Sequence, residues 1–195
     1  MATPRTAVIV FGRMNPPTTG HAKLIELLKA TAKPLNGDVI VFASPSRDPQ
    51  KNPLPFGVKV SFLKRLFRDV TINANASVTG PLDALAACSK LGYRRVVMVV
   101  GSDRLAKFES LRPYVRPKSS KGFDKSKDID LDQYSVVPIT RDPDSEDPVE
   151  GMSASKMRTV AQLGNFTLFR QGVPTNDKDL ARQLYDATRR HMGIK

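Results

Sequence analysis

The stretch that decides the fold is AVIVFGRMNPPTTGH, residues 7–21, which joins a strand, a loop and the start of a helix. Its apolar part, residues 7–11, is short, continuous and rich in β-branched side chains, which predicts a buried strand. Thr18 or Thr19 can cap the helix that follows, and the unpaired amides of its first turn form an anion site. The segment therefore predicts a strand and a helix whose connecting loop faces an anionic ligand.

The remainder of the chain repeats this alternation of short β-rich runs and longer helix-like runs. Alternating strands and helices imply right-handed βαβ units and a doubly wound parallel sheet, a Rossmann-like α/β fold. We expect a single domain over residues 1–195, with an α/β core over 1–151 and a helical C-terminal segment over 152–195, in two or three pieces broken at 172–174. The strands are predicted at 7–11, 38–43, within 71–78, at 95–100 and 133–139, and the helices at 20–32, 58–68, 81–92 and 102–111.

The chain carries a formal net charge of +12, with a pI near 10.0. Such an excess attracts polyanions, among them nucleotides, pyrophosphate and nucleic acid, without selecting one of them. A basic stretch at 113–127 and an acidic one at 142–150 are interpreted as solvated loops, with a lid or a nucleic-acid contact as alternatives. No apolar run approaches the roughly 20 residues that cross a bilayer, so we expect no membrane contact and a cytoplasmic protein, in the host cytoplasm if its origin is viral.

Two residues with reactive side chains are expected to be structural. Cys88, the single cysteine, lies in a helix-like apolar stretch, which favours a buried thiol over a nucleophile. His191 lies in a charged C-terminal helix and is expected at the surface. The sequence contains no GxxxxGK[ST] phosphate loop, which excludes kinases and GTPases of that type.

Ligands of a doubly wound sheet bind outside the carboxyl ends of its strands, and two of the loops there carry phosphate-binding features. In the first loop, Gly12 lets the backbone approach a ligand, and His21 lies in the first helical turn with its ring able to face a phosphate. In the segment GMSASKMR, residues 151–158, Ser153 can cap a helix, and Ser155 and Arg158 share one helix face. Hydroxyls, unpaired amides and a guanidinium at a helix start suit the β- and γ-phosphates of a triphosphate.

Two further loops carry supporting residues. Gly101 follows the most apolar strand and permits close approach of a base or ribose, and Asp103 can accept a hydrogen bond from a hydroxyl or cap a helix. The length, prolines and lysine of the loop at 44–54 indicate an ordered functional loop, which carries Arg47 and Lys51.

These motifs resemble those of the HxGH nucleotidyltransferase superfamily, the cytidylyltransferase-like proteins. TTGH at 18–21 fits the (H/T)xGH form of the signature loop, MSASKMR at 152–158 is similar to the ISSTxxR motif, and GSD at 101–103 is similar to the GxD segment. NPP at 15–17 is similar to bacterial nicotinate and nicotinamide mononucleotide adenylyltransferases. Gly12-Arg13 instead resembles archaeal-type members, and KNPL at 51–54 resembles short nucleotidyltransferases of large tailed phages. Threonine at position 18 departs from the commoner histidine but keeps a hydrogen-bond donor.

The resemblance, which spans about residues 7–172, implies a Rossmann-like fold of the nucleotidyltransferase type and a transfer of AMP from ATP to a phosphate-bearing acceptor. The foremost acceptor is nicotinamide mononucleotide, which gives NAD and pyrophosphate, with Mg²⁺ held mainly by the substrate phosphates and no protein metal site. Cytidylyl transfer, phosphopantetheine adenylylation and a non-catalytic, basic nucleic-acid-binding or virion-associated protein on the same fold stay open, as does homo-oligomerisation. The implied roles are catalysis for His21, Thr18 and Arg158, nucleotide binding for Gly12, Arg13, Gly20, Gly101, Asp103, Ser153 and Ser155, and acceptor binding for Lys51 and Arg47.

Overall fold

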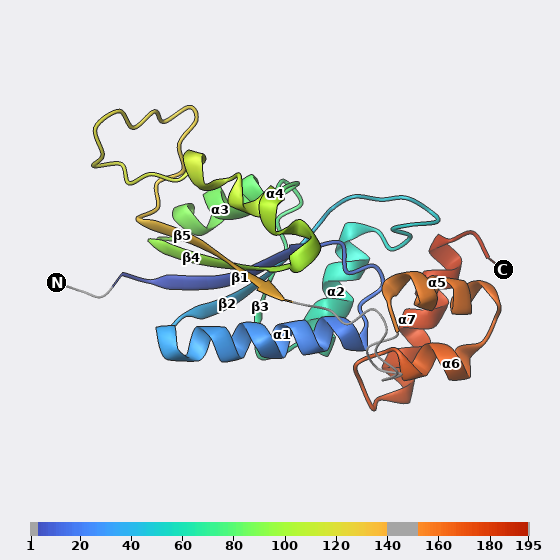
Figure 1. The fold of residues 1–195 in the computed structure, drawn as a ribbon. Helices are drawn as coiled ribbons and strands as arrows, with labels where there is room; N and C mark the ends of the chain where they lie inside the picture. The colour runs from blue at the N-terminus through green and yellow to red at the C-terminus, as the bar shows by residue number, and fades with distance from the viewer. Residues whose placement is uncertain (1–3, 140–151, 195) are drawn as a thin grey trace.

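The computed structural model describes residues 4–139 and 152–194, and a five-stranded parallel sheet forms its centre (Figure 1). The strand order is β3-β2-β1-β4-β5, so β1 lies between β2 and β4 and the order of the strands reverses beside it. Every neighbouring pair of strands is parallel. The predicted doubly wound sheet is confirmed. Its strands are β1 (Thr6–Gly12), β2 (Asp38–Ala43), β3 (Thr71–Asn73), β4 (Arg95–Gly101) and β5 (Gln133–Ile139).

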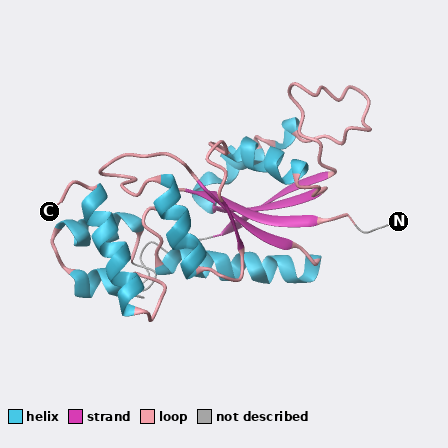
Figure 2. Cartoon of the chain, turned by 180° about the vertical axis from the view of Figure 1, so that it is seen from behind, coloured by secondary structure: helices cyan, strands magenta, loops and turns pink. Residues whose placement is uncertain are grey.

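Helices cover both faces of the sheet (Figures 1 and 2). Val10 packs on one face with α1 and α2, and its neighbour Ile9 packs on the other with α3 and α4. Because both faces are covered, alternate residues of one strand are all buried, and the strand sequence is continuously apolar. The helices are α1 (Thr19–Ala32), α2 (Phe56–Leu66), α3 (Pro81–Lys90) and α4 (Leu105–Glu109), with 3₁₀ turns η1 (Lys33–Leu35), η2 (Ser102–Arg104) and η3 (Arg112–Tyr114).

The C-terminal helices α5 (Ala154–Gln162), α6 (Phe166–Gln171) and α7 (Lys178–His191) gather at the end of the sheet where the strands finish (Figure 1). They form a third hydrophobic cluster, which Leu54 and Phe62 of the α/β core join. The extent of one domain over 1–195 and its division at 151/152 stay a prediction. The acidic stretch at 142–150 and Gly151 lie outside the described residues. None of the described helices is long and apolar enough to span a bilayer.

Several element ends differ from the sequence-based expectation. The short strand expected within 71–78 is confirmed as β3, which ends at Asn73 because the side chains of Asn73 and Asn75 accept hydrogen bonds from the N–H groups two residues ahead and turn the chain. The helix expected over 102–111 is divided into η2 and α4, and α2 starts two residues early, directly after Pro55. The C-terminal part breaks also at Gly164, whose φ of 73° ends the turn after α5.

Candidate nucleotide site

The reversal of strand order beside β1 brings the loops after β1 and β4 to the same edge of the sheet. In open α/β sheets this reversal point is where ligands bind. The loop after β2 lies next to them, because Ser44 N–H donates to the carbonyl of Gly12 over 2.8 Å. Three of the loops that carry the sequence motifs therefore share one end of the molecule with α5–α7.

The first helix start is held by a reciprocal pair of residues. Thr18 is the N-cap of α1 and is almost fully buried, and its side chain faces the N–H of His21 in a capping box. The imidazole Nδ1 of His21 accepts a hydrogen bond from the Thr18 N–H over 3.0 Å. Because Nδ1 acts as an acceptor, the neutral ring carries its proton on Nε2. Between the two candidates for the cap, the structure selects Thr18.

The first-turn amides of α1 are partly used by the protein itself. Thr19 N–H donates to the carbonyl of Gly172 over 2.9 Å, which ties the start of α1 to the end of α6. Among the described residues, the N–H of Gly20 has no backbone or side-chain acceptor. The first turn of α1 therefore offers an anion fewer amides than the sequence suggested, and its use as an anion site stays a prediction.

Arg158 connects the second helix start to the first loop. Its Nη1 donates to the carbonyl of Asn15 over 2.9 Å, across 143 residues of sequence. Burial lowers the pKa of Arg158, the nearby charge of Arg13 lowers it further, and Asp48 opposes the shift. Two guanidinium groups therefore repel each other at this end of the sheet, and an anion between them would relieve that repulsion.

Two buried polar residues fix the first loop against the loop after β2: Asn15 of the NPP segment, and Lys59, which no motif singled out. Asn15, only 1% exposed, donates from Nδ2 to the Leu54 carbonyl and accepts at Oδ1 from the Leu54 N–H, both at 3.0 Å. Lys59, 0% exposed, donates from Nζ to the carbonyl of Arg13 over 2.8 Å and to that of Ser44. Burial lowers the pKa of Lys59 to about 8. Nothing in the sequence distinguishes Lys59 from Lys64, the other lysine of its helix.

The loop after β2 is ordered, as its composition indicated. The Asp48 carboxylate accepts from the N–H groups of Gln50 and Lys51, which lowers the pKa of Asp48, and Asp48 forms an antiparallel bridge with Asn52. The side chain of Lys51 is exposed. Asn52 is buried, and its Oδ1 has no partner among the described residues, so a donor from a ligand or a water molecule would stabilise it here.

Arg47 lies near the end of α7. Burial lowers the pKa of His191, and the charge of Arg47 lowers it further. His191 was expected at the surface, and the structure shows it partly buried rather than fully exposed. The physical reason is that the loop after β2 and the C-terminal helix meet in space. Arg47 and Lys51 thus lie on the same loop, with Arg47 on the side toward α7.

Gly101 and Asp103 lie at the end of β4. Asp103 does not cap a helix by its side chain, which is 77% exposed. Instead, its Oδ1 would lie 2.4 Å from a Cβ added at Gly101, so the carboxylate folds back over the glycine. This contact gives a packing reason for glycine at position 101. It leaves the carboxylate accessible to a hydroxyl donor at the edge of the sheet.

The remaining predicted residues are placed as follows. Ser153 is the N-cap of α5, and its hydroxyl accepts from the Lys156 N–H over 3.2 Å, which confirms the capping prediction. Ser155 is exposed in the first turn of α5. A Cβ at Gly12 would meet only Met14, at 4.0 Å, so among the described residues the protein leaves space above this glycine. Cys88 is fully buried, and burial raises the pKa of its thiol to about 12, as expected of a structural cysteine.

The described part of the chain contains no group of three or more His, Cys, Asp or Glu side chains placed to hold a metal ion. The charged side chains that meet at the carboxyl end of the sheet are mainly cationic, and the carboxylates near them are the partly buried Asp48 and the exposed Asp103. This donor set fits a Mg²⁺ that is bound through substrate phosphates, because Mg²⁺ keeps several waters and needs few protein ligands.

Comparison with known proteins shows which solved structures share this fold. No family model and no curated protein matches the sequence. Among solved structures, the chain is similar to a Plasmodium falciparum nicotinic acid mononucleotide adenylyltransferase complexed with NaAD, with a TM-score of 0.59, 16% identity, and coverage of 93% of this chain and 98% of that one. It is similar to a bifunctional NMN adenylyltransferase/ADP ribose pyrophosphatase from Francisella tularensis, with a TM-score of 0.56, 16% identity, and 94% and 52% coverage. A third likeness is to Thermotoga maritima TmcAL bound with alpha-thio ATP, with a TM-score of 0.50, 16% identity, and 93% and 56% coverage.

The chain therefore has the Rossmann-like α/β fold of nucleotidyltransferases. Its structural neighbours include mononucleotide adenylyltransferases, which agrees with the resemblance of its sequence motifs. At 16% identity the likeness defines the fold, and the chemistry must be argued from the side chains of this chain.

Proposed function

We propose that the protein transfers a nucleoside monophosphate from a nucleoside triphosphate, foremost ATP, to a phosphate-bearing acceptor, foremost nicotinamide mononucleotide. The observation that carries this proposal is the hydrogen bond from Arg158 to the carbonyl of Asn15, because it joins the beginning of α5 to the motif-bearing loop that leads into α1. A triphosphate lying across this edge has its α-phosphate at the start of α1 and its β- and γ-phosphates at the start of α5.

The reaction is an in-line displacement at phosphorus. A phosphate oxygen of the acceptor attacks the α-phosphorus and forms a new P–O bond, while the bond to the β-phosphate oxygen breaks and pyrophosphate leaves with its electron pair. No covalent enzyme intermediate is needed. Catalysis consists of positioning two anions and stabilising the charge that builds in the transition state.

Each helix start supplies its own donors. At α1, the Nε2–H of His21 and the Gly20 amide bind the α-phosphate, with Thr18 fixing the ring through its backbone N–H. At α5, Arg158 and Ser155 bind the leaving pyrophosphate, and Arg13 adds positive charge. Ser153 acts mainly as a cap, because its hydroxyl already accepts from Lys156. Mg²⁺ bound to the substrate phosphates neutralises part of their charge.

The base and the acceptor occupy the flanking loops. Asp103 accepts a ribose hydroxyl beside Gly101, and the loop after β2 contacts the acceptor. Lys51 and Arg47, both exposed on this loop, supply the positive charge for the acceptor phosphate. The expected product with nicotinamide mononucleotide is NAD.

The test is a substrate matrix. Purified protein with Mg²⁺ is incubated with ATP, CTP, GTP or UTP against nicotinamide mononucleotide, nicotinate mononucleotide, phosphopantetheine or no acceptor, with pyrophosphate release and product mass as readouts. We expect acceptor-dependent pyrophosphate with ATP and nicotinamide mononucleotide. A different productive pair, CTP or phosphopantetheine included, would correct the substrate and keep the reaction class. Pyrophosphate release from no pair would overturn the proposal.

Two arginine variants, Arg158→Met and Arg68→Met, form the matched test and control. Arg158→Met is expected to abolish most of the release, because the guanidinium that binds the leaving group is lost. Arg68→Met changes the same charge on an exposed residue at the end of the α2 segment and should keep wild-type activity. Equal activity in both variants would contradict the role of Arg158.

A further inference from the structure

The long loop between η3 and β5, residues 116–128, is rich in lysine and is called the basic arm below. Its neck is closed by a bridge between Val115 and Ile129 and by a hydrogen bond from the Arg116 N–H to the Ile129 carbonyl, at 3.1 Å. Between these points the backbone makes consecutive turns closed by hydrogen bonds at 2.7–3.2 Å, such as those from Ser120 to Pro117 and from Asp128 to Asp124. The arm is thus an ordered structure with its own hydrogen bonds.

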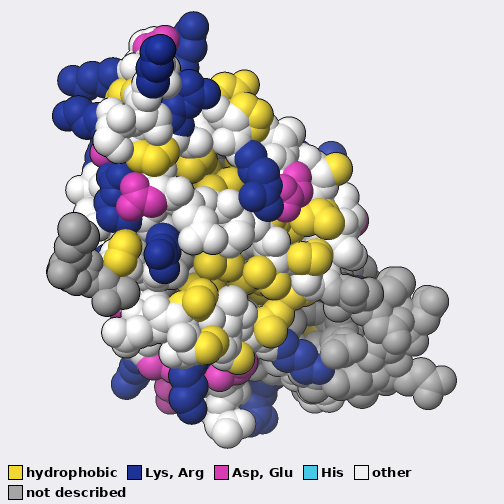
Figure 3. Space-filling view, turned by 60° about the vertical axis from the view of Figure 1, so that its left-hand side comes forward, with side chains coloured by type: hydrophobic (Ala, Val, Ile, Leu, Met, Phe, Trp, Pro, Cys, Tyr) yellow, Lys and Arg dark blue, Asp and Glu magenta, His cyan; other side chains and the backbone are white. Residues whose placement is uncertain are grey.

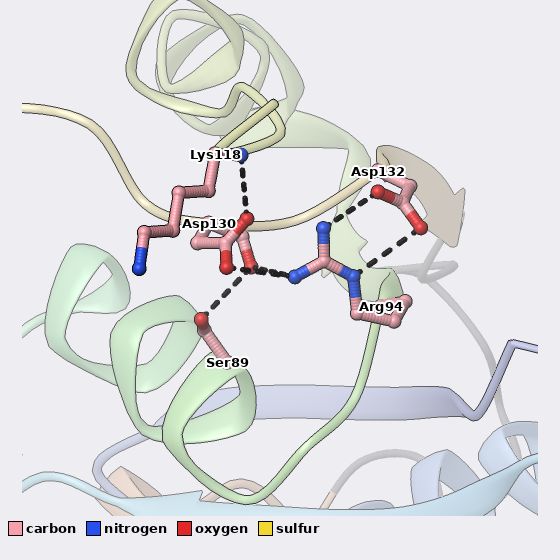
Figure 4. Close-up of polar contacts among 5 residues, drawn as sticks. All are labelled: Ser89, Arg94, Lys118, Asp130 and Asp132. Atoms are coloured by element: carbon pink, nitrogen blue, oxygen red, sulfur yellow. Dashed lines mark hydrogen bonds and ion pairs between the residues drawn. The ribbon is translucent and has the colours of Figure 1, made fainter. Parts of the chain in front are cut away.

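A cluster around Asp130 anchors the base of the arm to the sheet (Figure 4). Arg94, at the start of β4, pairs with Asp130 at 2.9 Å and with Asp132 at 2.6 Å. The Asp130 carboxylate also accepts from the backbone N–H of Lys118 at 2.7 Å, and its carbonyl accepts from the Ser89 hydroxyl at 2.8 Å. In Figure 4 no hydrogen bond or ion pair joins the Lys118 ammonium to these carboxylates, although its charge helps to lower the pKa of Asp130.

The two acidic residues of the arm are used to hold its shape. Asp128, whose side chain is 9% exposed, pairs with Arg116 at 3.5 Å and accepts from the Asp124 N–H. Asp124 accepts from both the N–H and the hydroxyl of Ser126 and lies 3.6 Å from the Lys127 ammonium. Both acids therefore stabilise turns; Asp128 faces inward, whereas Asp124, 45% exposed, lies beside Lys127.

The lysines of the arm point outward. Lys118, Lys121 and Lys125 are exposed, and no carboxylate in the described part of the chain pairs with any of them. In Figure 3, Lys and Arg side chains gather on the projecting end of the molecule, over the arm. This end lies far from α5–α7 and the candidate nucleotide site in both ribbon views (Figures 1 and 2). The small substrates of the site therefore do not account for this charge.

We infer that the basic arm is a docking surface for the sugar–phosphate backbone of a nucleic acid. Lysines on successive turns of one loop match a row of phosphates, whereas a compact anion needs donors that converge. A membrane or protein partner is disfavoured, because none of the exposed large hydrophobic side chains of the described residues lies within 116–128. Stable protein interfaces need apolar or aromatic anchors, and membrane adsorption gains much of its strength from apolar insertion.

The test is the salt dependence of oligonucleotide binding by the full chain. Labelled single-stranded DNA, single-stranded RNA and duplex DNA of mixed sequence are titrated with protein at several salt concentrations, with anisotropy as readout. For the triple variant Lys118→Gln, Lys121→Gln, Lys125→Gln we expect affinity near 0.1 M salt to fall roughly 100-fold, and the slope of log K against log salt to flatten by about 2 to 3.

A matched variant separates the arm from net charge. Lys33→Gln, Lys64→Gln, Arg68→Gln removes three exposed charges elsewhere and should bind nearly as the wild type does. Equal loss in both variants, or no binding of any oligonucleotide by the wild type, would overturn the inference. Equally tight, arm-dependent binding of polyglutamate or of anionic vesicles would overturn it as well. Circular dichroism confirms folding, and unchanged pyrophosphate release by the arm variant shows that the two ends act independently.

Discussion

The two ends of the sheet are held together in different ways. At the carboxyl end, buried side chains such as Asn15 and Lys59 bond to the backbone of neighbouring loops, out of contact with solvent. At the amino end, the basic arm is anchored by ion pairs of Arg94, whose side chain is 32% exposed. Buried polar contacts are costly to break because an unpaired group is left in a medium of low dielectric, whereas exposed ion pairs contribute little. The proposed site therefore depends on loops that buried contacts hold rigid, whereas the basic arm depends on exposed charge.

The largest effect is expected from His21→Ala, which removes the proposed donor to the α-phosphate together with the acceptor of the Thr18 N–H. Turnover should fall by about two to three powers of ten, as is typical when one preorganised donor is lost. Pyrophosphate release measures this, with thermal unfolding as the check of folding. His191→Ala removes the only other histidine and should leave turnover unchanged. Near-normal release by His21→Ala would defeat the proposed mechanism.

The next effect concerns Lys59 and is a dependence of stability on pH. Its pKa is about 8 in the folded protein, against an ordinary lysine value of 10.5, so the unfolded chain binds more protons between these values. Stability therefore rises with pH across this window, and the contribution is lost as pH falls through 8, by at most about 3 kcal/mol. As pH increases from 8 to 10.5, the free energy of unfolding of the wild type should rise relative to that of Lys59→Met, as measured by urea unfolding.

Lys64→Met is the control for this pH dependence, because Lys64 lies on the same helix and is exposed. Its unfolding free energy should run parallel to that of the wild type across the window. If the difference between wild type and Lys59→Met does not change with pH, the ammonium is not buried as described, and the contrast between the two ends loses its main support.

A third change tests the packing at the carboxyl end. A Cβ at Gly172 would lie 2.2 Å from Met157 Sδ and 3.2 Å from atoms of Met152, in the segment whose carbonyl accepts from Thr19. We expect Gly172→Ala to lower the free energy of unfolding by about 1–3 kcal/mol through overpacking. Gly57→Ala is the matched control, since nothing lies within 4 Å of its added Cβ. Chemical denaturation of both variants decides whether this junction tolerates a methyl group.

The smallest effect is expected at the amino end. Arg94→Gln removes ion pairs with Asp130 and Asp132 that are partly exposed, so the free energy of unfolding should fall by only about 1 kcal/mol. A double-mutant cycle with Asp132→Asn, repeated at high salt, measures the pair directly. A coupling of several kcal/mol that salt does not weaken would show that the arm is anchored as firmly as the site loops.

Much of the fold follows from local patterns along the chain. The five strands, the parallel order and most helix bounds agree with the periodicity of apolar residues, and Ser153 caps α5 as its sequence context indicated. An additional break in the C-terminal part, at Gly164, was not expected, and its backbone φ of 73° is responsible for it. The roles of the motif residues in nucleotide transfer stay predictions, which the proposed variants test.

The alternation of strands and helices, and the interest of His21 and Arg158, follow from local sequence, because periodicity and helix caps are encoded within a few neighbouring residues. The folded chain was needed to show that Lys59 bonds to Arg13 across 46 residues and that Arg158 meets Asn15 across 143. It was also needed to show that the Thr19 N–H donates to the Gly172 carbonyl. Such contacts depend on the path of the whole chain through space. A lysine that will be buried against two carbonyls has the same local pattern as one that will face water.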